Sequence, residues 1–404
     1  MKRVVVTGIG VVSPIGIDVD EFFQSLNKSK NGIDNVTIFD ASTFPCKFAG
    51  EVKNLNIKEY LKQWEGLSLI EDRKIVWGLK AVDDAIKSSG LSFKESSELG
   101  INMGVGVEYV NVNDLNPNND ITKKEIFHHP LDLLSSIVIS HYNLNGPSFL
   151  NTSACAASTQ AIGHSFQKIR SGEIKMMLAG GFDSMLNPVS FGNFALLGAL
   201  STDNDTPKKA CRPFDKTRNG TVLGEGSAVF ILEDLEHAKA RGANIYAEVS
   251  GYGTSMDAYK VTDPHPEGIG ATLAMRKAIS DANIDPTQIS YINAHGTSTP
   301  KNDYSETLAI KNTFGKHAYN LNISSLKSMI GHLIAAGGCM EIASSIFTLL
   351  RETIVPTINY NTPDPECDLN YTPNVPAKFK GEYILKNSFA FGGQNACIIL
   401  RKYI

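Results

Sequence analysis

The 404-residue chain is poor in cysteine, and its six cysteines are scattered, with no Cys-x-x-Cys pair among them. The spacings typical of zinc sites and dithiol redox centres are therefore absent, and we expect reduced thiols in a cytoplasmic protein. The chain also lacks basic runs, and its formal net charge is −4, so nothing suggests nucleic-acid binding. No apolar stretch approaches the length of a membrane span, and the one after Met1 is too short for a signal peptide.

Hydrophobic residues make up 42% of the chain and charged residues 20%, which is typical of a globular protein with a substantial core. Strand-like segments alternate with segments of helical periodicity, which favours an α/β fold with largely parallel sheets. The polar stretch Asn111–Lys124 is the best candidate for a mobile surface loop. The principal expected strands are Lys2–Thr7, Glu98–Val107, Ile174–Gly181, Ser227–Glu233, Ile245–Gly253, Ile289–Ala294, Leu321–Ser325, Tyr383–Phe391 and Ala396–Arg401. The principal expected helices are Asp18–Lys28, Leu67–Ser88, Leu131–Tyr142, Ala156–Arg170, Leu235–Arg241, Gly270–Ala282, Asp303–Phe314 and His332–Leu350.

The two halves of the chain look alike. In each half a strand leads to a turn of small residues and an Ala-rich helix, and a later strand carries Gly-Gly. We interpret this as an internal duplication, with one half over residues 1–245 and the other over residues 246–404. A duplication of this kind makes a five-layer α/β/α/β/α arrangement natural, and it places the two Ala-rich helix N-termini near one pseudo-twofold axis.

Cys155 stands out because it opens one of these Ala-rich helices. Ser153 is a plausible N-cap, so Cys155 would lie in the first helical turn. Unpaired N–H groups and the helix dipole would then stabilise its thiolate, as in an activated nucleophile. For a single cysteine, a buried apolar role is the commoner interpretation.

Two histidines and a lysine occur where strands or helices end. His295 follows an apolar strand, and ligands bind at that position in α/β sheets. His332 precedes an almost uncharged helix whose dipole would lower its pKa, so the imidazole would stay neutral and could donate a hydrogen bond. The alternatives are two structural histidines and a solvated Lys327. Glu341 has apolar neighbours, which indicate burial and hence a partner.

The stretch Phe389–Asn395 predicts a turn at a strand edge. Gly392 and Gly393 would allow backbone amides to approach a ligand closely, and Phe391 could act as an apolar gate. Phe389 and Phe391 could equally be core residues on one strand face. Together, a thiolate and two neutral imidazoles suit a nucleophile that carries an acyl group, with two donors for a developing enolate or oxyanion.

Gly8-Ile9-Gly10 resembles the start of a dinucleotide-binding fingerprint but does not complete it. The third glycine position holds Ser13, and Pro14 follows at once. An oxidoreductase is therefore the weakest of the functional hypotheses.

The sequence resembles the β-ketoacyl-acyl-carrier-protein synthases, which are condensing enzymes of the thiolase fold, and it is most similar to the type II branch. The resemblance covers nearly the whole chain. It is carried by six motifs in the family's order, which are Thr152–Ser158, Arg212–Asp215, Leu223–Gly226, Asn293–Pro300, Lys327–His332 and Asn387–Gly393.

The resemblance implies a role for each site residue. It makes Cys155 the acyl-accepting nucleophile, with His295 and His332 promoting malonyl decarboxylation. Lys327 and Glu341 match positions that hold the region of His332. Thr297 and Thr299 match residues that bind the phosphopantetheine arm, and Phe389 belongs to the substrate pocket. The backbone N–H groups of Cys155 and Phe391 match the oxyanion hole. The resemblance implies no metal and no redox cofactor, an acyl carrier protein as partner, and a dimer.

Some positions depart from the family pattern. Ala390 stands where the family usually has Gly, Gln394 replaces Thr or His, and His128-His129-Pro130 is atypical. These departures fit a type II polyketide or aryl-polyene ketosynthase, paired with a chain-length-factor subunit, nearly as well as a fatty-acid enzyme. The dimer is therefore expected to be either a homodimer or such a heterodimer. A non-catalytic partner subunit is disfavoured, because such subunits lose the active cysteine.

Overall fold

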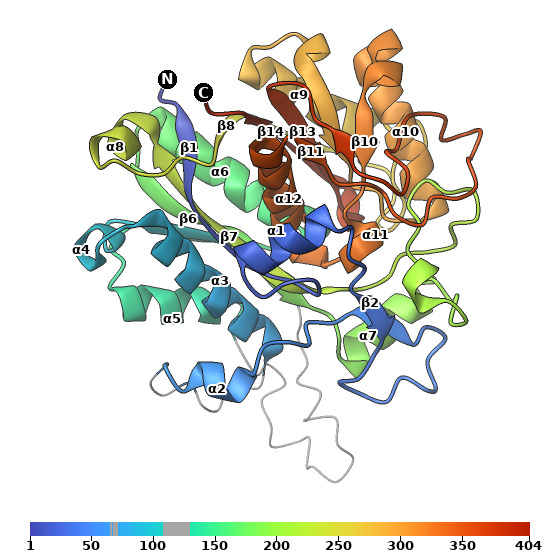
Figure 1. The fold of residues 1–404 in the computed structure, drawn as a ribbon, viewed down its shortest axis with the longest axis horizontal. Helices are drawn as coiled ribbons and strands as arrows, with labels where there is room; N and C mark the ends of the chain where they lie inside the picture. Colours follow the sequence, from blue (N-terminus) through green and yellow to red (C-terminus); the bar gives the residue numbers. More distant parts are fainter. Residues whose placement is uncertain (65–66, 68–71, 108–129) are drawn as a thin grey trace.

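The computed structural model describes residues 1–64, 67, 72–107 and 130–404. Ten strands form one central sheet in the order β10-β9-β13-β14-β8-β1-β7-β6-β4-β5, and its two halves join through residues 4–6 and 247–249 (Figure 1). The strands of the first half are β1 (Val4–Val12), β4 (Gly100–Val105), β5 (Ser148–Asn151), β6 (Met176–Ser184) and β7 (Glu225–Asp234). Those of the second half are β8 (Ala247–Met256), β9 (Ile289–Asn293), β10 (Asn322–Ser324), β13 (Tyr383–Phe389) and β14 (Gln394–Arg401).

The two halves share one topology, as the predicted duplication requires. Within each half, the strands lie in the order third, second, fourth, fifth, first along the sheet. In each half the fifth strand is antiparallel to both of its neighbours within that half, and the second strand is parallel to both of its own. We propose that the halves divide between residues 245 and 246, in the connection from α8 (Leu235–Ala240) to β8.

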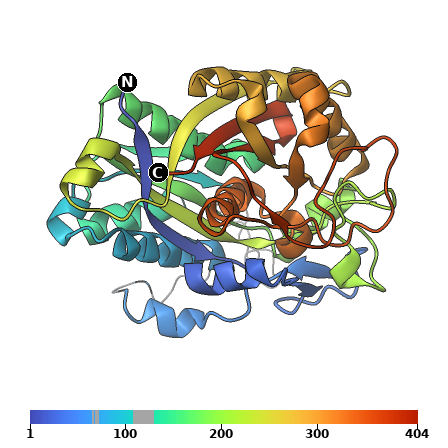
Figure 2. The same cartoon turned by 45° about the horizontal axis from the view of Figure 1, so that its top comes forward.

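Helices complete five layers, which confirms the α/β/α/β/α prediction. Helices α6 (Ala157–Ser171) and α12 (Gly337–Arg351) pack between the two halves of the sheet, and α12 lies in the middle of the molecule in both views (Figures 1 and 2). The outer helices of the first half are α3 (Arg73–Ser89) and α5 (Leu133–Tyr142), and those of the second half are α9 (Ile269–Ala282) and α10 (Pro300–Phe314). The shorter helices are α1 (Val19–Asn27), α2 (Ile57–Leu61), α4 (Phe93–Ser96), α7 (Pro188–Leu196) and α11 (Lys327–Ile330). Two small hairpins pair β2 (Ile33–Asn35) with β3 (Phe48–Gly50) and β11 (Thr353–Ile354) with β12 (Ala377–Lys378).

Helices α6 and α12 also begin in the same way. Each has 15 residues and follows a three-residue 3₁₀ turn, η3 (Ala154–Ala156) before α6 and η7 (Ile334–Ala336) before α12. The first residue of each turn is left-handed, with φ of 46° at Ala154 and 45° at Ile334. The two turns contact each other, so the helix N-termini meet as the duplication predicted.

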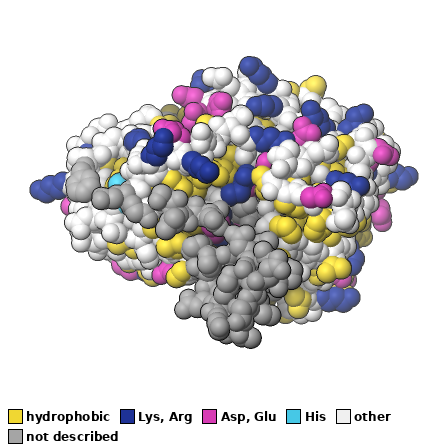
Figure 3. All heavy atoms as spheres, turned by 90° about the horizontal axis from the view of Figure 1, so that it is seen from below, with side chains coloured by type: hydrophobic (Ala, Val, Ile, Leu, Met, Phe, Trp, Pro, Cys, Tyr) yellow, Lys and Arg dark blue, Asp and Glu magenta, His cyan; other side chains and the backbone are white. Residues whose placement is uncertain are grey.

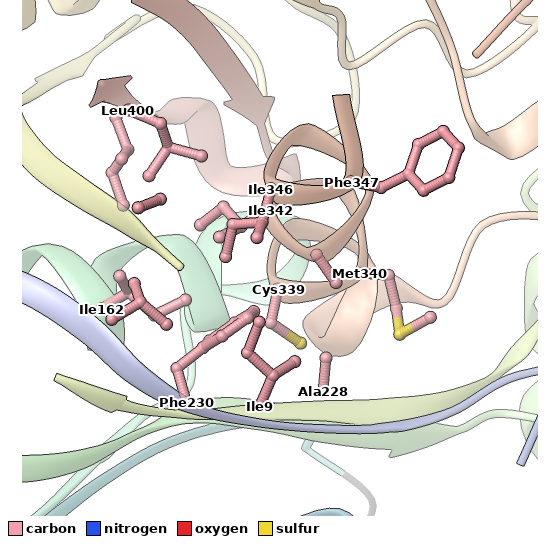
Figure 4. Packing of buried hydrophobic residues seen from close by; sticks show 14 of the residues in the cluster. Ile9, Ile162, Ala228, Phe230, Cys339, Met340, Ile342, Ile346, Phe347 and Leu400 are labelled. Carbon is pink, nitrogen blue, oxygen red and sulfur yellow. The ribbon is translucent and has the colours of Figure 1, made fainter. Parts of the chain in front are cut away.

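Helix α12 corrects the expectation that no segment is long and apolar enough to cross a membrane. Together with its preceding turn, Ile334–Arg351 has that length and composition, but 89% of it is buried inside the fold. Figure 4 shows Cys339 and Ile342 of α12 pointing towards Ile9 and Phe230 of the first-half strands. The apolar character of α12 is therefore that of a core helix packed on all sides.

The other predicted elements differ mainly at their ends. The first strand continues to Val12 instead of ending at Thr7. The helix expected from His332 begins at Gly337, because Ile334, with φ of 45°, and the 3₁₀ turn η7 come first. The predicted loop Asn111–Lys124 lies outside the described residues.

The continuation of β1 explains Gly8 and Gly10. A Cβ at Gly8 would lie 2.3 Å from the carbonyl oxygen of Ala85, and one at Gly10 would lie 1.9 Å from that of Ala81. These glycines allow α3 to approach the strand, so they do not form a nucleotide-binding loop.

We expect Gly10→Ala to lower the free energy of unfolding by about 3 kcal/mol or more, because the new methyl group meets backbone rather than a movable side chain. Gly192→Ala is the matched control. It lies inside α7, where its Cβ would meet only Phe44, at 3.4 Å, so we expect no loss and a gain of up to about 1 kcal/mol. Urea unfolding followed by circular dichroism measures both, and equal midpoints for Gly10→Ala and wild type would contradict the packing argument.

Candidate active site

Cys155 lies at the bottom of a pocket of about 280 Å³. The pocket wall includes the two predicted histidines and both predicted phenylalanines of the 389–391 segment. The cysteine sits in η3, directly after β5, and only 6% of its surface is exposed. The strand, turn and helix predicted from the sequence are therefore present, and they place a thiol at the inner end of an accessible cavity.

The electrostatic prediction for this thiol was wrong. The side chain of Ser153 does not cap the helix. Burial raises the pKa of Cys155 to about 11, although the charge of Lys327 and the N–H of Phe391 each lower it. The desolvation of the thiolate outweighs the favourable charge and hydrogen bonds. The resting group is consequently a neutral thiol.

A neutral resting thiol predicts a particular pH profile for alkylation. We expect the rate of Cys155 alkylation by iodoacetamide to rise about tenfold per pH unit between about pH 7 and pH 9, because only the thiolate reacts and its pKa is higher still. Peptide mass spectrometry separates Cys155 from the other five cysteines, all of which are buried. A rate that levels off near neutral pH would instead indicate the stabilised thiolate that the sequence suggested.

His332 contacts the cysteine directly. Its Nε2 lies 3.1 Å from Sγ of Cys155, and its Nδ1 accepts a hydrogen bond from the backbone N–H of Ile334 at 3.2 Å. A ring nitrogen that accepts carries no proton, so the proton of the neutral ring is on Nε2 and points into the pocket. Burial, followed by the charges of Lys327 and Lys386, holds the pKa of His332 well below its usual value. The predicted neutral donor is therefore present, although burial and not a helix dipole is the main cause.

His295 has the same tautomer for a similar reason. The Lys327 ammonium donates to its carbonyl oxygen at 2.6 Å and lies 3.3 Å from its Nδ1. Burial, and after it the charge of Lys327, lowers the pKa of His295 well below its usual value. The ring is therefore neutral, with its proton on Nε2. The two imidazole centroids are 5.3 Å apart at 83°.

The sulfur of Cys155 and a nitrogen from each ring lie within 4.8 Å of one another. This spacing allows one small group in the pocket to touch all three. Because both rings present N–H and not a lone pair, the arrangement suits an anionic oxygen better than a metal ion.

Lys327 and Glu341 form a buried pair beside His295. The resemblance matched them to positions that hold the region of His332; in the structure Lys327 contacts His295, and its second partner is Glu341. Gly331, with φ of 76°, lies between Lys327 and His332, and the lysine side chain reaches His295, which follows β9. The pair is buried and lies behind the other imidazole.

The predicted substrate-binding residues all line the same pocket. The hydroxyls of Thr297 and Thr299 lie 2.8 Å apart, and Thr299 also caps α10 by accepting from Asn302. Phe389 is buried with its ring 5.9 Å from that of His295, whereas Phe391 is 37% exposed at the pocket edge. Apolar side chains also reach the surface elsewhere, as the yellow areas in Figure 3 show.

Two buried charged residues of the site were missed by the sequence analysis. Glu306 of α10 accepts hydrogen bonds from the backbone N–H groups of His295 and Gly296, each at 2.8 Å, and burial raises the pKa of this carboxyl to about 7. Lys386, in the middle of β13, reaches Glu341. The signal for Lys386 was that it is the one charged residue of its strand, and Glu306 had no such signal.

Family models match both halves of this chain. The N-terminal domain model of β-ketoacyl synthase covers residues 1–238, and the C-terminal domain model covers residues 246–361. The chain belongs to the β-ketoacyl synthase family. The family resemblance seen in the sequence is thereby confirmed.

Relatives within the β-ketoacyl synthase family match over their whole length. The chain is 41% identical to 3-oxoacyl-[acyl-carrier-protein] synthase 2 of Synechocystis, over 100% of this chain and 98% of that one. It is 39% identical to the protein of the same name from Staphylococcus aureus, over 100% of this chain and 99% of the other.

Solved structures of β-ketoacyl synthases share the fold. The ishigamide ketosynthase/chain length factor superposes with a TM-score of 0.89 at 32% identity, and a β-ketoacyl synthase from Burkholderia phymatum superposes with a TM-score of 0.88 at 32% identity. Both matches cover 100% of each chain. The thiolase-like fold expected from the sequence is confirmed.

Two of the positions that depart from the β-ketoacyl synthase pattern lie at the turn after β13. Gln394 accepts a hydrogen bond from Gln160 of α6 at 3.1 Å, so the residue at this position ties the turn to the nucleophile helix. Ala390 lies in extended backbone, which alanine adopts without strain. The third departure, His128-His129-Pro130, lies largely outside the described residues, since only Pro130 is described.

Proposed function

We propose that the protein is a cytoplasmic 3-oxoacyl-acyl-carrier-protein synthase, which condenses a malonyl unit with an acyl thioester carried on Cys155. The observation that carries the proposal is the convergence of one thiol and two imidazole N–H groups within 4.8 Å. A thiol can hold an acyl group, and two neutral donors can stabilise an enolate without protonating it. Both substrates would arrive on the phosphopantetheine arm of an acyl carrier protein.

The first half-reaction is acyl transfer. Sγ of Cys155 attacks the thioester carbonyl, the carrier thiol leaves and takes up the proton that Cys155 loses, and the acyl group remains on the cysteine. The oxyanion of the tetrahedral intermediate would accept from the backbone N–H groups of Cys155 and Phe391, and the Phe391 N–H already faces the sulfur. Thr297 and Thr299, at the pocket wall, would hydrogen-bond the arm.

The second half-reaction is decarboxylative condensation. The malonyl thioester loses carbon dioxide, and the electron pair of the broken bond forms an enolate whose oxygen would accept from Nε2–H of His295 and His332. The enolate carbon then attacks the acyl carbonyl, the C–S bond breaks, and the departing thiolate takes up one proton from solvent, which restores the thiol. Lys327 would act through His295, since it fixes Nδ1 as the acceptor.

The direct test is reconstitution with purified malonyl- and acyl-carrier protein. We expect one carbon dioxide per turnover and a 3-oxoacyl product two carbons longer than the acyl substrate, identified by mass spectrometry of the carrier protein. Hydrolysis of the acyl thioester without chain extension would contradict the proposal.

A specialised type II polyketide or aryl-polyene ketosynthase is the second candidate. It is favoured by the 32% identity over the full chain to the ishigamide ketosynthase/chain length factor and by the unusual Ala390 and Gln394. The two candidates differ in their partner: the first needs a homodimer, whereas the second needs a cysteine-less chain-length-factor subunit. Activity of the protein alone favours the first, and activity only on co-expression with such a subunit favours the second.

A further inference from the structure

Lys386 is a buried lysine in the core of the sheet. It lies at the centre of β13, and its side chain is fully buried. Its Nζ is 3.0 Å from Oε2 of Glu341 and 2.9 Å from Oγ1 of Thr159, and it also contacts Oγ of Ser388. The ammonium therefore donates hydrogen bonds to the hydroxyls of Thr159 and Ser388 and forms an ion pair with Glu341.

Glu341 is shared between two lysines. Its Oε1 pairs with Lys327, and its Oε2 pairs with Lys386. One carboxylate between two ammonium groups leaves an excess of one positive charge in a site where water cannot screen it. A purely structural ion pair would need only one lysine.

The groups that face this excess charge include the proposed reactive residues. Burial has the largest effect on the pKa of Lys386 and lowers it. The charge of Glu341 raises this pKa, and the charge of Lys327 lowers it. The Lys386 charge is in turn among the causes that lower the pKa of both imidazoles. The titratable groups that interact electrostatically with Lys386 are Glu341 and Cys339 from α12, Lys327 from α11, Cys397 from β14, and His295 and His332.

We infer that Lys386 is a positioning residue whose buried positive charge, joined to that of Lys327 through Glu341, stabilises the anion that forms at Cys155. Lys386 does not touch the pocket. It acts by holding Glu341 between two cations, so that Lys327 keeps its contact with His295 while the cluster as a whole remains positive. The role in condensation depends on the proposed function, but the thiolate can be followed without it.

The test measures alkylation of Cys155 by iodoacetamide as a function of pH in the full-length protein. Lys386→Met and Lys386→Gln both remove the charge, and Gln keeps polar atoms for Thr159 and Ser388. We expect both variants to be alkylated several-fold more slowly than wild type at a fixed pH below the thiol pKa, because loss of a buried positive charge lowers the fraction of thiolate. Lys386→Arg keeps the charge and is expected to stay close to wild type.

The outcomes separate the charge from packing. Slow alkylation in the Met and Gln variants with a near-normal rate in Lys386→Arg supports the inference, provided that thermal melting shows folded protein. If Lys386→Met does not fold, Lys386→Gln decides, because it retains hydrogen-bonding atoms. An unchanged rate in a folded neutral variant, or an equally slow Lys386→Arg, overturns it. The measurement follows the alkylation of Cys155 and requires no carrier protein. The inference about Lys386 can therefore be wrong while the proposed function is right, and it can be right while the proposed function is wrong.

Discussion

Cys155→Ala is expected to abolish acyl transfer and to lower condensation by about 10⁴-fold or more, since loss of a covalent nucleophile removes the whole route. The alanine leaves the pocket, both imidazoles and the fold intact, because Cys155 occupies a turn in which small residues already predominate. Intact-protein mass spectrometry after incubation with acyl-carrier protein measures the effect. The wild type should gain one acyl group and the variant none.

Cys211→Ala is the matched control for this experiment. Cys211 is also a buried thiol, in the same apolar cluster as Cys155, but it is not among the residues that line the pocket. We expect this variant to be acylated as the wild type is. Persistent acylation of Cys155→Ala would remove the cysteine from its proposed role, whatever the control shows.

Replacing His295 or His332 with alanine is expected to slow malonyl decarboxylation by about 10²- to 10³-fold in each case, the cost of losing one pre-organised donor to a developing oxyanion. Each ring supplies one Nε2–H, so neither can replace the other. The measurement is carbon dioxide release from malonyl-carrier protein. Acylation of Cys155 should fall much less, because the oxyanion of that step would be held by backbone N–H groups.

His332→Asn and His164→Ala complete this experiment. Asparagine keeps an N–H donor, so His332→Asn should retain more decarboxylation than His332→Ala. His164 lies on α6 against Tyr252 and does not line the pocket, so His164→Ala should behave as wild type. If His332→Ala stopped acylation while leaving decarboxylation intact, His332 would be a base for the thiol and not a donor for the enolate.

Local sequence patterns were enough to predict the fold. The alternation of strands with helices predicted an α/β fold, although the sheet is mixed and not largely parallel as expected. The repeated small-residue turn predicted the duplication and its layers, which the strand order confirms. Cys155, His295 and His332 were identified because each lies at the end of an element, where a polar residue beside small neighbours is conspicuous. Thr297 and Thr299 were identified from the family resemblance. The structure brings Cys155, His295 and His332 together, although Cys155 and His332 are 177 positions apart in the sequence.

The environment of the site could not be predicted in the same way. The high pKa of Cys155 depends on how deeply the fold buries it, and a helix-dipole argument cannot estimate that cost. The contact of Lys327 with His295 is a tertiary contact, which the local sequence does not show. Lys386 has no charged neighbour in the sequence, and its role can be inferred only from the structure, in which Glu341 pairs with both Lys327 and Lys386.

The two equivalent 3₁₀ turns of the duplicated halves have different roles. Cys155 occupies the middle of η3, and the middle of η7 is Ala335, whose backbone N–H donates to Asp183 at 2.9 Å in the opposite half. The turn η3 carries the reactive sulfur, whereas η7 forms a hydrogen bond that ties the two halves together. Substitutions at the middle of η3 can therefore change the chemistry of the site without removing the hydrogen bond that η7 makes between the halves.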